Sequence, residues 1–320
     1  MENSIRVAGW KDYFHNDCMR INLNISDICN FSCSYCINRN VHKKHRVLKK
    51  ETLSHFIEDL GERNRDSYYF GISGGEPLIY PHIEFMLEKI ESAIHTDNKY
   101  VCILSNGSLL PEKGKYLYEK VDKTKLSFSI SVHIEQIDLK KFCDSIVSFG
   151  HLDDLNCKIL LAPGYLEQAK RSLEMLRERD IPIIIGPVTS PAGQPYEFSD
   201  EEIDFLNQFK DNVKEAVFFL EYENGSAEDI FRVAKGLHPE KSDFYGMRCL
   251  AGRNSLGLGP DGIVRRCFWA GKEFFDLNET RLRDIPELNQ PYICPSHFCN
   301  CHAFLRMPKW INDKDAPDYL

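Results

Sequence analysis

The sequence predicts an α/β protein in which strands and helices alternate along the chain. Six apolar runs of strand length occur before residue 190, and apolar residues at helical spacing separate them. Glycine and proline residues stand at several junctions. This alternation is typical of parallel βαβ units joined by right-handed crossovers. The pattern leaves open whether the sheet is doubly wound or curved into a partial barrel.

The first predicted strand, residues 20–25, alternates apolar and polar side chains and runs directly into a loop rich in cysteine. Further strands are expected near residues 68–72, 100–104, 126–132, 156–161 and 181–185. Helices are expected between the strands, at about residues 51–60, from Pro81 to Ile94, after Pro111, through residues 137–146 and through residues 166–176.

The strand–helix rhythm stops near residue 190, where Pro191, Gly193 and Pro195 indicate a boundary. We therefore expect three parts. Residues 1–190 form the α/β core with a lead-in, residues 191–245 form connecting helices, and residues 246–320 form a small cysteine-rich domain. In this last part, Pro260-Asp261-Gly262 between apolar residues predicts a β-hairpin, to which a helix and loops are added.

Composition and charge exclude several classes of protein. A hydrophobic content of 42% and a charged content of 28% are ordinary for a soluble globular chain. No apolar run approaches the ~18 residues that span a bilayer, and the N-terminus lacks a secretion signal, so we expect a cytoplasmic protein without a membrane partner. The net charge of −8 argues against a nucleic-acid partner. Twelve cysteines in such a chain indicate metal or cluster ligation instead of disulfides.

Three of these cysteines, Cys29, Cys33 and Cys36, lie within eight residues of one another. So short a loop can bring its three thiols to a single metal centre. A cubane iron–sulfur cluster takes one thiolate per iron, so three cysteines would leave one iron open to a small chelating ligand. The alternatives are a zinc knuckle or a run of buried free cysteines.

The Cys-x3-Cys-x2-Cys spacing, with Tyr35 just before the last cysteine, resembles the signature of the radical S-adenosylmethionine (SAM) superfamily. The resemblance implies a partial (β/α)6 barrel with the cysteine loop after the first strand. It also implies a [4Fe–4S] cluster whose open iron binds SAM, an external reductant such as flavodoxin or ferredoxin, and cleavage of SAM to a 5′-deoxyadenosyl radical.

Further candidates for cofactor binding follow the later strands, because ligands of parallel α/β proteins collect at the carboxyl ends of strands. Gly74-Gly75-Glu76-Pro77 resembles the motif that contacts the amino group of SAM in this family, although such a turn can be purely structural. Other candidates, each with an ordinary structural alternative, are Ser105 and Asn106 after the third strand, Ser129, Ser131 and His133 at the end of the fourth, and Gly186 at the end of the sixth.

The C-terminal part carries a second group of cysteines. The pattern Cys249-x12-Gly262-x4-Cys267, followed by Cys294, Cys299 and Cys301, resembles the twitch or SPASM extension of radical SAM enzymes. The resemblance implies one auxiliary [4Fe–4S] cluster, since five thiols provide four ligands and leave one over; tetrahedral zinc is the alternative. Whichever of Cys249, Cys294, Cys299 and Cys301 does not ligate the cluster is a candidate hydrogen-atom donor.

These observations favour a radical SAM oxidoreductase or epimerase. Only 28 residues precede Cys29, too few for a leader-peptide-binding domain, so we expect a small polar metabolite such as a sugar, cyclitol or nucleotide-linked sugar as substrate. A peptide maturase that uses a separate recognition protein is the first alternative. An iron–sulfur electron-transfer protein or a zinc-binding protein without radical chemistry is the second.

Overall fold

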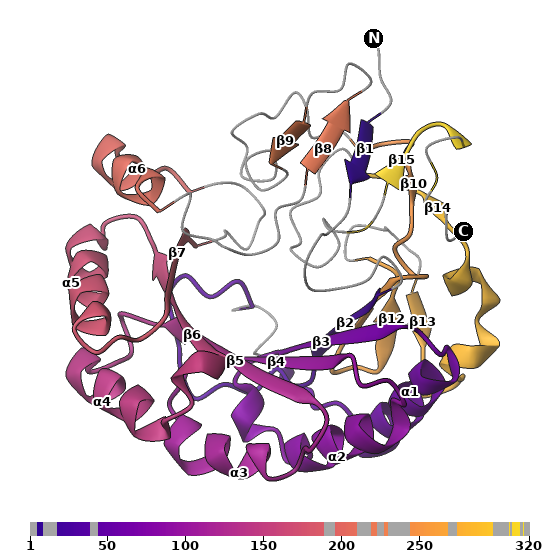
Figure 1. Cartoon of the computed structure of the whole chain (residues 1–320), viewed down its shortest axis with the longest axis horizontal. Coiled ribbons are helices and arrows are strands. Elements are labelled where there is room, and N and C mark those ends of the chain that lie inside the picture. Colours follow the sequence, from indigo (N-terminus) through magenta and orange to yellow (C-terminus); the bar gives the residue numbers. More distant parts are fainter. Residues whose placement is uncertain are drawn as a thin grey trace.

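A curved nine-stranded sheet organises the molecule in the computed structural model, in the order β13-β12-β11-β2-β3-β4-β5-β6-β7 (Figure 1). The structure describes residues 5–8, 18–38, 44–188, 196–209, 219–222, 227–229, 244–267, 274–296, 307, 309–313 and 316. Six consecutive strands pair in parallel: β2 (Cys18–Asn24), β3 (Ser67–Ser73), β4 (Lys99–Ser105), β5 (Lys125–Val132), β6 (Leu155–Leu161) and β7 (Ile183–Pro187).

Helices cover the convex side of this sheet (Figure 1). They are α1 (Lys50–Glu62), α2 (Ile83–Ala93), α3 (Lys115–Tyr118), α4 (Leu139–Phe149) and α5 (Leu166–Arg177). Every second strand residue, such as Phe70, Phe128 and Ile159, packs with the apolar stripes of these helices in one hydrophobic core. The predicted parallel α/β fold is therefore confirmed, with a curved sheet that does not close into a barrel within the described residues.

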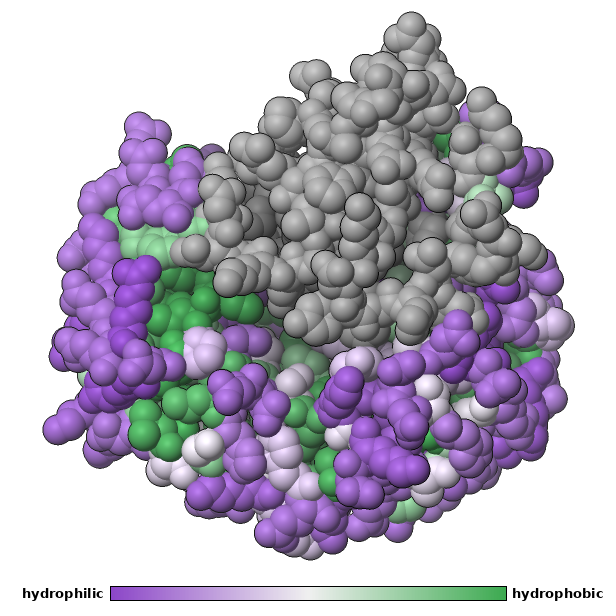
Figure 2. Space-filling model, viewed as in Figure 1, coloured by the Kyte–Doolittle hydropathy of each residue, from purple (hydrophilic) through white to green (hydrophobic). Residues whose placement is uncertain are grey.

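The other strand residues face the concave side. They include Ser127, Ser129 and Ser131 on β5 and Asn156 and Lys158 on β6, each of which alternates with a fully buried neighbour. On the visible face in Figure 2, hydrophilic residues dominate the outer rim and hydrophobic residues gather at the left, over β6 and β7.

The C-terminal segment adds three strands to the same sheet. Strand β11 (Ser255–Leu258) pairs in parallel with β2, and β12 (Ile263–Arg265) and β13 (Phe274–Asp276) follow in antiparallel fashion. The predicted hairpin is thus β11–β12, with Gly262 at φ 80° in its turn, a conformation that favours glycine. A small separate sheet joins β10 (Arg248–Cys249) to β14 (Tyr292–Ile293) and β15 (Lys309–Trp310).

The prediction of connecting helices for residues 191–245 is only partly right. Helix α6 (Asp200–Asn207) is present and begins with a capping box between Ser199 and Glu202. However, β8 (Phe219–Tyr222) and β9 (Ala227–Asp229) are strands that form a sheet with β1 (Ile5–Ala8). The physical reason is long-range pairing with the N-terminal strand, which overrides a local helical pattern.

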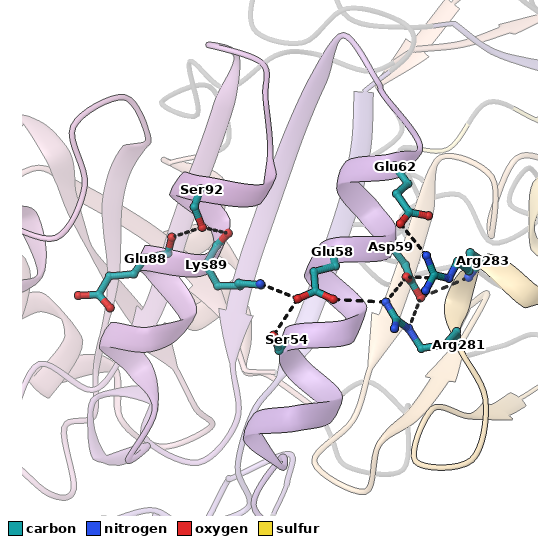
Figure 3. A network of polar contacts seen from close by, with 9 residues as sticks. All are labelled: Ser54, Glu58, Asp59, Glu62, Glu88, Lys89, Ser92, Arg281 and Arg283. Atoms are coloured by element: carbon teal, nitrogen blue, oxygen red, sulfur yellow. Dashed lines mark hydrogen bonds and ion pairs between the residues drawn. The ribbon is translucent and has the colours of Figure 1, made fainter.

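A polar network fixes the C-terminal segment to the helices of the core (Figure 3). Arg281 Nε donates to Asp59 Oδ2 at 3.1 Å, and Arg283 Nη1 donates to Glu62 Oε1 at 2.7 Å. The Asp59 side chain is fully buried on α1, so the Arg281 guanidinium compensates a charge that would be costly alone.

None of the described helices is long and apolar enough to cross a membrane.

Candidate active site

The cysteine loop leaves the carboxyl end of β2 and is anchored at once to the turn that follows β3. Gly75 N donates to Ser26 O at 2.7 Å, and Glu76 N donates to Ile28 O at 2.8 Å. A Cβ atom on Gly75 would lie 1.9 Å from Ile28 O, so only glycine permits this approach. The two segments predicted to bind the cluster and SAM therefore form one unit.

The three thiols of the loop lie near one another and form no disulfide. Burial, and then the charges of Cys36 and Cys29, raise the pKa of the Cys33 thiol to about 12. Burial also raises the pKa of Cys29, although Phe31 N donates to its Sγ at 3.4 Å. In the metal-free chain the Cys29 and Cys33 thiols are protonated at neutral pH, so metal binding must release their protons.

Glu76 is fully buried and points away from the loop mouth toward β4. Its Oε1 accepts from Ser105 Oγ at 2.8 Å and Leu78 N at 3.0 Å, and its Oε2 accepts from Asn106 N at 2.7 Å. Burial nevertheless raises its pKa. The carboxylate thus joins the loops after β3 and β4, and it is already occupied by donors of the chain itself.

Asn106 extends this unit to the cysteine loop. Its Nδ2 donates to Asn30 Oδ1 at 2.8 Å and lies 3.9 Å from Cys29 Sγ. Its Oδ1 accepts from Ser108 N at 3.0 Å, which fixes the orientation of the amide. The predicted residues Ser105 and Asn106 therefore lie beside the cysteine loop, and Asn106 contacts Cys29, a predicted ligand of the cluster.

The segment after β5 holds the other side of the cysteine loop, and sequence reasoning missed it apart from His133. Glu135 accepts from Ser34 N at 2.8 Å, from Ser34 Oγ, and from Tyr165 OH at 2.8 Å. Gln136 Oε1 accepts from Ser32 N at 3.3 Å. Burial would raise the pKa of Glu135, but the hydrogen bonds from Ser34 and Tyr165 outweigh it and lower that pKa.

Aromatic side chains pack beside the thiols. The ring of Tyr35 stacks on His133 at 6.0 Å between centroids, and Tyr35 OH lies 3.4 Å from His133 Nδ1. Phe31 meets His133 edge to face at 6.0 Å. Burial lowers the pKa of His133 to about 4, so this imidazole is neutral at physiological pH.

The remaining predicted cofactor-binding residues lie farther along the concave face. Ser129 and Ser131 share that face on β5, and Ser129 Oγ donates to Asn156 Oδ1 at 3.0 Å. Gly186 on β7 has open space at its Cβ position, with Lys158 Cε nearest at 3.8 Å. Pro77 begins a short 3-10 helix and is buried.

Three of the C-terminal cysteines lie around Tyr292. Cys249 on β10 is paired in register with Tyr292 on β14, and Cys294 follows two residues later. Burial, and then the charges of Cys267, Cys249 and Cys294, raise the pKa of Tyr292. Cys299 and Cys301 lie outside the described residues, so the choice among the predicted ligands of an auxiliary cluster stays a prediction.

The cysteine loop has the donor chemistry that an iron–sulfur cluster needs. Cys29, Cys33 and Cys36 would supply one thiolate each to three irons of a cubane and leave the fourth iron open to a chelating ligand.

Comparison with known proteins agrees with this reading of the site. Residues 23–192, which contain the cysteine loop and β3 to β7, match the family model described as the radical SAM superfamily. The chain belongs to the radical SAM superfamily. Membership confirms the predicted [4Fe–4S] cluster and SAM as its cofactors. The twitch or SPASM character of the C-terminal segment stays a prediction.

Several radical SAM relatives share most of their length with this chain. The GTP 3′,8-cyclase of Nostoc sp. (strain PCC 7120) is 32% identical over 301 residues, covering 84% of each chain. The GTP 3′,8-cyclase of Crocosphaera subtropica is 26% identical over 314 residues, covering 85% of each chain. The 7-carboxy-7-deazaguanine synthase of Methanothermobacter thermautotrophicus is 27% identical over 187 residues, covering 51% of this chain and 72% of that protein.

Solved radical SAM structures share the fold. Native anSMEcpe with bound AdoMet superposes with a TM-score of 0.58 at 16% identity, covering 85% of this chain and 81% of that one. Streptococcus suis SuiB bound to S-adenosylmethionine gives a TM-score of 0.57 at 14% identity, covering 84% and 65%. At this level of identity the likeness concerns the fold alone.

Proposed function

We propose that this radical SAM enzyme abstracts a hydrogen atom from a C–H bond of a small polar, nucleotide-type metabolite. The observation that carries the proposal is the meeting of three strand ends: the cysteine loop after β2, the Gly74–Pro77 turn after β3 and the segment after β5 are hydrogen-bonded into one site. When bound there, the cluster and SAM supply a 5′-deoxyadenosyl radical. The chain itself holds the cofactors, excludes water and positions the substrate.

The concave face supports a polar substrate. Asn22 and Asn24 on β2, Ser131 on β5 and Asn156 on β6 alternate with residues of the buried core and therefore face this side. Lys158 is in register with Ser131 and shares its orientation. A cation among hydroxyl and amide groups favours a ligand that combines hydrogen-bonding groups with negative charge, as a nucleotide does.

Arg265 adds a second cation to this face, where its guanidinium also lies 3.7 Å from Asp261 Oδ2. It is in register with Gly257 on β11, which is in turn in register with Asn22 on β2, so the three residues point to the same side of the sheet. Several relatives are named for reactions of guanine derivatives, which also favours a nucleotide-type substrate over a simple sugar or cyclitol.

The fate of the substrate radical belongs to the same proposal. An auxiliary cluster held by Cys249, Cys267 and Cys294 with one further cysteine would accept an electron, and loss of a proton would complete an oxidation. A C-terminal cysteine that is not a ligand would instead return a hydrogen atom and produce epimerisation. The electrons that start the reaction would come from an external reductant such as flavodoxin or ferredoxin.

The test is anaerobic reconstitution followed by incubation with SAM, dithionite and single nucleoside triphosphates or nucleotide-linked sugars, each deuterated on the sugar. We expect an electron paramagnetic resonance signal of a reduced cubane that SAM perturbs, and deuterium in the 5′-deoxyadenosine formed with one substrate class. The matched control is the C29A/C33A/C36A variant, which should form none. Deuterium transfer only from a peptide, or a zinc-loaded protein without a cubane signal, would refute the proposal.

A further inference from the structure

An arginine bridges two parts of the chain that carry different groups of cysteines. Arg46 Nε donates to Asp27 Oδ2 at 2.7 Å, and Arg46 Nη1 donates to Asp261 Oδ2 at 2.7 Å. Asp27 precedes the cysteine loop, and Asp261 occupies the turn between β11 and β12. We propose that Arg46 is a positioning residue that couples the C-terminal hairpin to the SAM-binding loop.

On the loop side, Arg46 binds the stem of the cysteine loop, the residues 25–28 that lead into it, through both its backbone and its side chain. Asp27 N donates to Arg46 O at 2.8 Å, and Leu48 N donates to Ile25 O at 2.9 Å. The Asp27 side chain is only 2% exposed, so its charge depends on the guanidinium for compensation. Asp27 is two residues before Cys29.

The residues on either side of Asp27 bind the Gly74–Pro77 turn. Ser26 O and Ile28 O accept from Gly75 N and Glu76 N at 2.7 and 2.8 Å. A displacement of Asp27 therefore shifts the backbone that enters the cysteine loop together with the turn predicted to meet the amino group of SAM.

On the hairpin side, Asp261 is held in place by its own surroundings. Its Oδ1 accepts from Ile263 N at 3.2 Å, and its carbonyl accepts from Asn278 Nδ2 at 2.9 Å. Asn278 in turn accepts from Thr52 Oγ1 on α1 at 2.9 Å. Strand β12 then leads, two residues after its end, to Cys267.

The guanidinium suits this role because its planar fork donates in two directions at once, whereas a lysine ammonium is a single point charge. One end of the fork fixes the stem of the SAM-binding loop, and the other fixes the hairpin that leads to the C-terminal cysteines. The position of the hairpin is thereby coupled to the SAM-binding loop through one side chain. The inference requires the SAM-binding cluster and is independent of the identity of the substrate.

The test measures the dissociation constant of SAM on anaerobically reconstituted full-length protein, with iron content and apo-chain thermal stability recorded for every variant. The sensitive variant is D261N, because it keeps the buried Asp27–Arg46 pair and weakens, besides the Arg46 contact, only the longer 3.7 Å pair of Asp261 with Arg265 within the hairpin. We expect D261N to weaken SAM binding about fivefold and R46K about tenfold, within the range typical of coupling residues. The effects of D261N and R46K on the dissociation constant of SAM should not be additive, so the double variant should match R46K within twofold.

The matched control is R281Q. It breaks another buried ion pair between the C-terminal segment and α1, with Asp59, but touches no part of the loop stem. We expect R281Q to lower the melting temperature as much as R46K while SAM affinity stays within twofold of the parent protein. Equal losses of SAM affinity in R281Q and D261N, unchanged SAM affinity in D261N, or additive effects of D261N and R46K would each overturn the assignment.

Discussion

Replacing Glu76 with glutamine tests whether the buried carboxylate organises the SAM-binding site. The amide oxygen can keep the two donors that share Glu76 Oε1, but the amide nitrogen then faces Asn106 N–H at the position where Oε2 accepts at 2.7 Å. One charge-assisted hydrogen bond, of about 1.5–3 kcal/mol, is lost, and a buried N–H left without an acceptor costs about 1–3 kcal/mol. Removing the buried charge offsets part of this, so we expect a net destabilisation of about 3 kcal/mol.

The chain offers a matched control in Glu91. One of its carboxylate oxygens accepts from Thr124 N and Oγ1, and the other accepts from Lys123 N at 3.0 Å, so its pattern of donors repeats that of Glu76. These donors precede β5, at the sheet edge opposite the cysteine loop. E91Q should therefore lower stability, by less than E76Q because the Glu91 side chain is 20% exposed, without affecting SAM.

The assay pairs urea unfolding of the metal-free chain with SAM titration of the reconstituted protein. E76Q should lower the unfolding free energy and weaken SAM binding at least tenfold. E91Q should lower the unfolding free energy and leave SAM binding unchanged. If E76Q changed the unfolding free energy by less than about 0.5 kcal/mol, or if both variants bound SAM equally, the role assigned to Glu76 would be wrong.

Three other perturbations address the surroundings of the cysteine loop. E135A removes the acceptor that holds the middle of the loop, so in the metal-free chain Cys33 should react with iodoacetamide about tenfold faster, measured by mass spectrometry. His133 has a pKa lowered to about 4, so its contribution to stability is complete above its unfolded pKa of about 6.5 and is lost as pH falls toward 4. The difference between a pKa of about 6.5 and one of about 4 corresponds to about 3 kcal/mol, and H133Q should flatten the fall of the unfolding free energy measured in urea over that pH range. G75A forces a Cβ to within 1.9 Å of Ile28 O and should cost about 2–3 kcal/mol in urea unfolding and reduce cluster content after reconstitution.

Each of these three outcomes has a control that can contradict it. E135Q keeps an acceptor and should accelerate alkylation less than E135A; identical rates for parent and both variants would remove Glu135 from the loop's support. If the unfolding free energy fell equally with decreasing pH in H133Q and in the parent protein, a group other than His133 would be responsible for the pH dependence. G186A introduces the same methyl group where the nearest atom is 3.8 Å away, so equal losses in G186A and G75A would contradict the steric argument.

The sequence predicted the βα units well because each strand and helix carries its own periodic signal. The expected strand at residues 126–132 corresponds to β5, Lys125–Val132, in which serines alternate with buried Leu126, Phe128 and Ile130. The ends of such strands meet at one edge, so placing candidate residues there required no knowledge of pairing partners. Ser105, Asn106 and His133 were found in this way.

Contacts between distant segments escaped prediction. Glu135 meets Ser34 across 101 positions of sequence, and no local pattern indicates that contact. The position of Glu135 just beyond the end of β5 was the one signal that could have found it. The predicted role of Glu76 is refined for the same reason, since its partners belong to the next loop. Strand β8 pairs with β1, more than 200 residues earlier, and β9 pairs with β8; a local periodic pattern cannot indicate the first of these pairings.

Strand β11 continues the main sheet beside β2 in parallel register, over Ser255–Leu258 against Arg20–Leu23. The C-terminal segment is therefore not a detachable module. A protein shortened before residue 255 would leave the backbone amides and carbonyls of β2 unmatched along an open border, a template for self-association. Chimeras that exchange this segment between relatives should place their junction ahead of β11. The exchanged segment then contains the strand that pairs with β2.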